Sequence, residues 1–245
     1  MSAFPDRHTV EVDNLAALSD RKKYAFDPSL LAFETAGPFW EILEAERMSL
    51  AVSREYEHFV VVLGATNGVP RQSVLPLPHP SGIAFDQTRC ELILSSTRTP
   101  NLIFWLRPVT AEDFRREIVP EKLQPPEGVL FLPYRSVMLP GTLNIHEIAL
   151  VGEELVATVT GHNFLARISQ RGAWQRTWWP LCLDAVGRDG FRENHLQLNG
   201  IAAGATIDDS HFTAFSDSVD GPKPWKQGYG PRGKGVVFSG HSREV

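Results

Sequence analysis

The residues best suited to chemistry in this chain are polar side chains that stand beside a recurring Ile-Ala pair. Ser81, His146 and Asn199 each lie two residues before the isoleucine of that pair, in the segments SGIA, HEIA and NGIA. Hydroxyl, imidazole and amide groups can transfer protons, bind a substrate through hydrogen bonds or ligate a metal. The recurrence therefore predicts one site to which successive repeats each contribute a polar side chain.

The same repeats carry further polar residues before the pair and in the loop after the second apolar run. If the pair lies at the start of the first strand of each repeat, then the residues before it and the loop between the second and third strands lie at the same end of the fold. The side chains that we expect to bind a small polar ligand there are His79, Ser81, Arg98 and His162.

Proton transfer and metal binding are assigned to other members of the set. His146 and His195 are the candidates for general acid or base, because imidazole titrates near neutral pH. Asn199 and Asp217 offer oxygen ligands for a divalent metal ion, the cofactor that such a site would use. A structural explanation stays open for each residue, since Asn199 before Gly200 also suits a turn and a histidine before a proline also suits a loop.

The elements that must position these residues are predicted to be strands. From Met48 onward, runs rich in β-branched and aromatic residues alternate with Gly, Pro, Asn and Asp, and long helical patterns are missing between them. Two insertions, 108–139 and 221–235, are too rich in proline or glycine to form central strands. This pattern predicts an all-β, β-propeller-like domain over 48–245 with about four blades.

The segment 1–47 is predicted to be an N-terminal extension or a closing segment. Within it, 38–47 suits a short helix or a strand. Counting from Met48, the last blade has three strands, the third of them beginning near Gly235. A closed ring would need an N-terminal strand in that blade or further blades beyond it, because an open edge leaves backbone groups unpaired.

Four segments of the chain, HPSGIAFD, GTLNIHEIAL, ENHLQLNGIAAG and SDSVDGPKPWK, resemble a bacterial family of conserved proteins of unknown function with a propeller-like fold of six blades. The resemblance covers roughly Leu50 to Ser239. Members of that family continue further, so the resemblance implies a C-terminally truncated chain and an incomplete ring.

A more distant similarity links LNGIA to the Pro-Asn-Gly-Leu/Ile motif of NHL- and gluconolactonase-type propellers. In those proteins the asparagine ligates a divalent metal, and it would correspond to Asn199. Leu198 replaces the proline, and no Glu-Gly-Pro motif supplies the glutamate that the family uses beside it.

Composition narrows the class of protein. The chain has 245 residues, 42% of them hydrophobic, and a net charge of −5, which gives no general basic surface for nucleic acid. Two cysteines are too few for a disulfide framework. No run suits a secretion signal or a membrane span, so we expect a cytoplasmic protein without nucleic-acid or membrane partners.

The function predicted from these observations is binding of a small polar molecule at the mouth of the propeller channel. Metal-assisted hydrolysis or isomerisation is one extension of it, and the sequence leaves open whether the protein is an enzyme. Two alternatives also stay open, a non-catalytic protein-interaction scaffold and a non-functional fragment.

Overall fold

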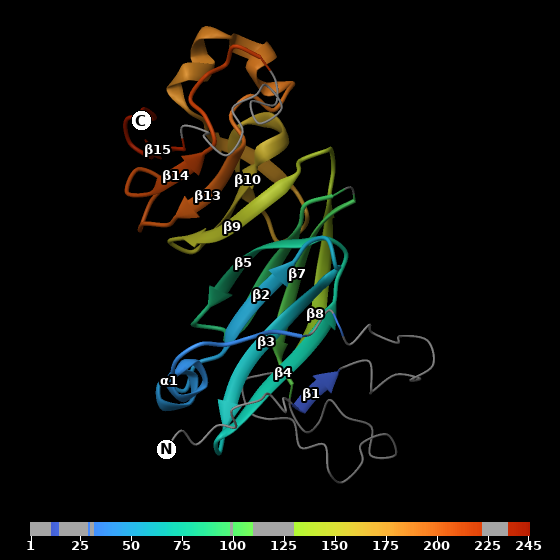
Figure 1. The fold of residues 1–245 in the computed structure, drawn as a ribbon. Coiled ribbons are helices and arrows are strands. Elements are labelled where there is room, and N and C mark those ends of the chain that lie inside the picture. The colour runs from blue at the N-terminus through green and yellow to red at the C-terminus, as the bar shows by residue number, and fades with distance from the viewer. Residues whose placement is uncertain (1–10, 15–28, 30–31, 99, 110–129, 222–234) are drawn as a thin grey trace. The chain divides into compact units, whose positions relative to one another are not determined.

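The computed structural model describes residues 11–14, 29, 32–98, 100–109, 130–221 and 235–245 (Figure 1). Strands dominate this part of the chain, and they form four sheets. Contacts divide the chain into two compact units, one of residues 1–79 with 106–134 and one of residues 80–105 with 135–245.

The first unit contains a sheet with the order β1-β4-β3-β2. Its strands are β1 (Glu11–Asn14), β2 (Leu50–Arg54), β3 (Phe59–Thr66) and β4 (Val69–Pro76). Strands β2, β3 and β4 pair antiparallel, whereas β1 runs parallel to β4. The N-terminal strand thus pairs in the first sheet and does not complete the last one.

A short helix, α1 (Phe39–Ala45), accompanies this sheet and settles the alternative left open for 38–47. Trp40 and Leu43 are its buried residues, and Leu63 of β3 packs against them. The carboxylate of Glu44 accepts the backbone N–H of Gly68, at 2.9 Å from nitrogen to oxygen. The helix is therefore anchored to the β3–β4 turn as well as to the face of the sheet.

The other three sheets follow chain order, as in a meander. One is formed by β5 (Pro80–Asp86), β6 (Glu91–Ser96), β7 (Asn101–Pro108) and β8 (Phe131–Leu139). The next is formed by β9 (Ile145–Val151), β10 (Glu154–Val159), β11 (Phe164–Ile168) and β12 (Trp174–Trp178). The last is formed by β13 (Leu198–Ala202), β14 (His211–Ala214) and β15 (Val236–Ser239). The fold is therefore all-β and propeller-like, with four blade-like sheets.

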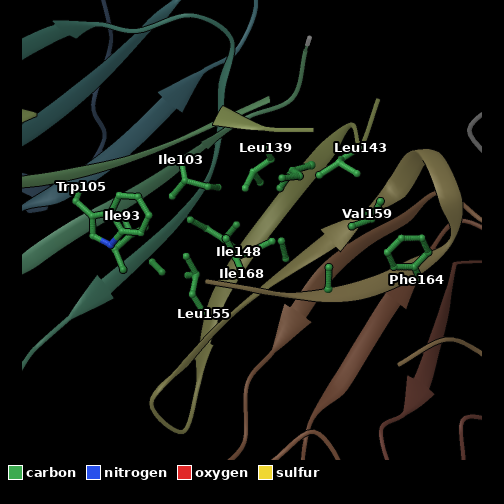
Figure 2. Packing of buried hydrophobic residues seen from close by; sticks show 14 residues of the cluster. Ile93, Ile103, Trp105, Leu139, Leu143, Ile148, Leu155, Val159, Phe164 and Ile168 are labelled. Atoms are coloured by element: carbon green, nitrogen blue, oxygen red, sulfur yellow. The ribbon is translucent and has the colours of Figure 1, made fainter. Parts of the chain in front are cut away.

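Two apolar clusters hold the second unit together. Figure 2 shows the first, in which Ile103 and Trp105 of β7 lie near Ile148 and Leu155 of the β9–β12 sheet. In the second, Trp178 packs against Phe212 with the two rings tilted and their centroids 4.4 Å apart. Central strands such as β10 are buried on both faces, which explains their continuous apolar runs. Each cluster therefore joins residues of one sheet to residues of the next.

Strand β8 lies within the first predicted insertion, 108–139, whose prolines argue against a central strand. Its residues 131–139 form the last strand in the order β5-β6-β7-β8, so the strand is at an edge of the sheet. Pro133 is tolerated there because an edge strand has one side that donates to no neighbour. Residues 110–129 of that insertion, and 222–234 of the second one, lie outside the described residues.

Candidate functional site

The three Ile-Ala segments form the first strands of their sheets, β5, β9 and β13, and each begins with the same irregularity. The strand register shifts within 80–83, opposite 145–148 and within 198–200, which marks a β-bulge in each pair. In every case a residue with positive φ lies two positions before the polar candidate: His79, Asn144 and Gln197, with φ of 46°, 50° and 51°. A bulge after a left-handed residue re-aims the following side chain.

The repeat extends to a hydroxyl residue at one position of each second strand. Ser95 Oγ accepts the backbone N–H of Gly82 at 3.0 Å, and Thr158 Oγ1 accepts that of Glu147 at 2.9 Å. Thr213 occupies the same position beside Gly200, where its Oγ1 lies 2.6 Å from the place of an added Cβ. Hydroxyl groups thus satisfy two backbone donors that the bulges remove from the sheet ladder.

Strands β5 and β9 approach each other closely at the predicted site. Ser81 Oγ donates to the backbone oxygen of His146 at 2.8 Å. A Cβ added to Gly82 would lie 2.5 Å from the nitrogen of Ile148, closer than real contacts allow. Only glycine fits at position 82, and the structure brings Ser81 and His146 together.

Asn199 occupies the equivalent position of β13, and β13 packs against β9. Thr160 Oγ1 of the loop after β10 donates to the backbone oxygen of Leu198 at 2.5 Å and holds the start of β13. The Oδ1 atom of Asn199 is buried and has no hydrogen-bond partner among the described residues. A buried amide oxygen without a donor is a group that a ligand or a water molecule can satisfy.

Glu147 is the residue that the sequence reasoning missed. It stands where the other two repeats have Gly82 and Gly200, so it is the one side chain at this position of the three first strands. Its carboxylate accepts the backbone N–H of Ile148 at 3.0 Å and is half-buried. Burial raises the pKa of Glu147, while the N–H groups of Ile148 and Ile83 oppose that shift. A glutamate at a glycine position of the repeat was the signal that could have identified it.

Ser81, His146, Glu147 and Asn199 are called the first-strand site below. The three loop candidates lie between the second and third strands, as predicted: Arg98 after β6, His162 after β10 and Asp217 after β14. His162 Nδ1 lies 2.7 Å from the backbone oxygen of Phe191, and its ring stacks on Phe164. Ligand binding by Arg98 and His162 stays a prediction.

His195 lies in a network that orders the chain before β13. Its backbone N–H donates to Oδ1 of Asn163 at 2.9 Å, and its Nδ1 lies 3.1 Å from the oxygen of Gly221. The same Asn163 oxygen accepts the N–H of Leu196 at 3.0 Å. These contacts give His195 a structural role, and its role as acid or base stays a prediction.

His79 belongs to the first unit, where its ring packs edge-on against His58 with centroids 4.2 Å apart. Its backbone N–H also donates to Nδ1 of His58 at 3.3 Å. Ligand binding by His79 stays a prediction.

Metal binding has no cluster to support it in the described part of the chain. Within those residues, no three His, Cys, Asp or Glu side chains are grouped closely enough to hold a metal ion. Asn199 and Asp217 as metal ligands therefore stay a prediction. Among the same residues, no helix combines the length and apolarity that crossing a membrane requires.

Comparison with known proteins gives one family and a group of solved structures. The model of a family described as a domain of unknown function (DUF4915) matches residues 37–245. No curated protein matches the chain.

The similar solved structures include a streptogramin B lyase, with a TM-score of 0.41, 14% identity and coverage of 78% of this chain and 51% of that one. Virginiamycin B lyase from Staphylococcus aureus has a TM-score of 0.42 and 15% identity, and the match covers 69% of this chain and 46% of that one. The Swd1 (Cps50) β-propeller domain of Myceliophteria thermophila has a TM-score of 0.43 and 11% identity, and the match covers 83% of this chain and 52% of that one. This chain therefore spans about half the length of each of these proteins.

Proposed function

Since the chain belongs to the DUF4915 family, whose description assigns no activity, we propose from the site itself that it binds a small polar molecule at the first-strand site. The observation that carries the proposal is the bulge repeated at the start of β5, β9 and β13. A bulge next to a functional site changes the direction of a side chain and costs sheet pairing. Here three bulges lie at equivalent positions, and each changes the direction of one polar residue, Ser81, His146 or Asn199.

The groups at this site favour a neutral ligand that carries hydroxyl or carbonyl oxygens. Asn199 supplies a buried acceptor, and Ser81 a hydroxyl group. Glu147 is half-buried with a raised pKa, so its carboxyl group retains its proton to higher pH than an exposed one. The amide of Asn199 and the hydroxyl of Ser81 carry no charge, so they recognise a polar molecule through hydrogen bonds and need no opposite charge on it.

Proton transfer is the chemistry that the site would add to binding. A carboxyl group with a raised pKa can donate a proton to a ligand oxygen and take one back within the same cycle. Glu147 is the group that we assign to this role, with His146 next to it in the chain as the second. Hydrolysis or isomerisation of a neutral polar molecule is the reaction class that this pair supports.

The experiment is an NMR titration of the whole chain with two neutral probes, glucose and glucono-1,5-lactone. We expect saturable shifts of backbone amides in 81–84, 146–149 and 199–202 with at least one probe. The variants His146→Ala and Asn199→Ala should lose them. Glu154→Gln is the control, because Glu154 pairs with Arg167 at the exposed end of β10, away from the bulges. Shifts confined to other segments, or unchanged in both site variants, would disprove the proposal.

A catalytic role is tested separately by following acid release from the lactone. Glu147→Gln keeps the size of the side chain and removes its proton transfer, so it should retain probe binding and abolish turnover. Binding with no turnover in the wild type would leave a binding protein and remove the assignment of Glu147. The alternative of a protein-interaction scaffold stays a prediction.

A further inference from the structure

A second polar feature of the same unit lies at the opposite edge of the β9–β12 sheet from β9. Arg176 of β12 is exposed, and its guanidinium carbon lies over three aromatic rings. The distances to the ring centroids are 4.0 Å for Phe191, 5.0 Å for Trp179 and 5.7 Å for Phe164. The side chain thus folds onto an aromatic surface where most surface arginines extend into water.

The rings that support Arg176 also support one another. Trp179 meets Phe191 edge to face at 5.9 Å, and Phe164 meets Phe191 at 6.2 Å. Trp174 stacks on Phe164, with ring centroids 5.6 Å apart. A guanidinium group held on packed rings loses less conformational freedom when its N–H groups bind a ligand, because its plane is already fixed.

The acidic residues nearby are already paired. Asp184 accepts hydrogen bonds from Nη2 of Arg243 at 2.8 Å and from Nε1 of Trp179 at 2.7 Å. Asp189 pairs with Arg192 at 3.4 Å. Among the described residues, no carboxylate forms an ion pair with Arg176. The aromatic surface therefore carries a positive charge that the described part of the chain does not neutralise.

We infer that Arg176 and the rings of Phe164, Trp179 and Phe191 form a binding site for an oxyanion, a carboxylate or phosphate group. The planar fork of a guanidinium group binds two oxygens of such a group at once. The rings partly remove water from the cation and leave its N–H edge for the anion. Arg176 lies on β12, the last strand of its sheet, whereas the residues of the first-strand site lie on β5, β9 and β13.

The experiment titrates the whole chain with inorganic phosphate, and in a second series with acetate, at constant ionic strength. The NMR signal of the Arg176 Nε–H group reports binding at the site itself. We expect saturation with at least one anion, and a dissociation constant raised about tenfold or more in Arg176→Lys, which keeps the charge but loses the fork. Saturation with only one of the two anions identifies the group that the site prefers.

The control is Arg188→Gln, because Arg188 is an exposed arginine of the neighbouring 3-10 segment Gly187–Phe191 and stacks on none of these rings. It removes one positive charge nearby and should leave the dissociation constant within about twofold. Near-ultraviolet circular dichroism checks that Arg176→Lys keeps the aromatic packing. A linear response in the wild type, an unchanged constant in Arg176→Lys or an equal loss in Arg188→Gln would each overturn the inference.

Discussion

Replacing Gly82 by alanine tests the close approach of β5 and β9 on which the first-strand site depends. The new Cβ would lie 2.5 Å from the nitrogen of Ile148 and 2.7 Å from the carbonyl carbon of Glu147, against an ordinary contact of 3.4 Å or more. Both neighbours are backbone atoms of β9, so relief requires the strands to separate. Overpacking of this kind costs about 3 kcal/mol at the upper end of its usual range.

Part of that cost is offset, because alanine restricts the unfolded chain more than glycine does, by about 0.5–1 kcal/mol. We therefore expect Gly82→Ala to lower the free energy of unfolding by about 2 kcal/mol or more. Gly200→Ala is the matched control at the same position of β13. Its Cβ would meet Oγ1 of Thr213, the end of a side chain that can rotate away. That variant should lie within about 1 kcal/mol of the wild type.

Urea unfolding followed by tryptophan fluorescence measures both variants, and the hydrogen bond from Ser81 to His146 should be lost in Gly82→Ala alone. Equal midpoints for the two variants would refute the reasoning, because they would show that β5 and β9 do not meet at Gly82.

Three further predictions address single groups of the second unit. Burial raises the pKa of Glu147, so folding favours its protonated form, and this contribution to the stability of the wild type is lost as pH rises through the raised pKa. The free energy of unfolding of Glu147→Gln should therefore increase relative to that of the wild type between pH about 4 and neutrality. A difference between the two proteins that does not change with pH would contradict this. Asn163→Ala removes four hydrogen bonds of a buried amide and should lower the free energy of unfolding by about 3 kcal/mol, with a loss below about 1 kcal/mol speaking against the network. Burial raises the pKa of Cys182 to about 11, so at pH about 8 this thiol should react slowly with a disulfide reagent while the exposed Cys90 reacts fast. Cys90→Ser should abolish the fast phase, and a fast phase that persists in this variant would disprove the assignment.

The repeat could be predicted from the sequence because it depends on local patterns. The Ile-Ala pairs mark first strands since their apolar residues alternate with small or polar ones and turn residues precede them. That pattern also placed Arg98, His162 and Asp217 in the second-to-third loops, where the structure has them. The bulges themselves are not visible in the pattern, because they are a property of how two strands pair.

Glu147 and Asn163 could not be singled out from the sequence for a different reason. The importance of Glu147 comes from burial between β5 and its own strand, and burial depends on contacts between residues far apart in the chain. Asn163 looks like a loop residue, yet its amide binds groups about 30 residues away. The prolines of 108–139 exclude a central strand, and β8 is an edge strand; whether an edge strand forms there depends on its pairing with β7, which the proline pattern does not show.

The asparagines that begin or precede the third strands make adjacent sheets depend on each other for stability. Asn101 donates to the oxygen of Gly141, ahead of β9, just as Asn163 holds the segment ahead of β13. When such a third strand detaches, the connector that leads into the following sheet loses its anchor as well. Local unfolding on heating should then extend from one sheet to the next. In hydrogen exchange, the amides of each connector and of the third strand that binds it should lose protection together.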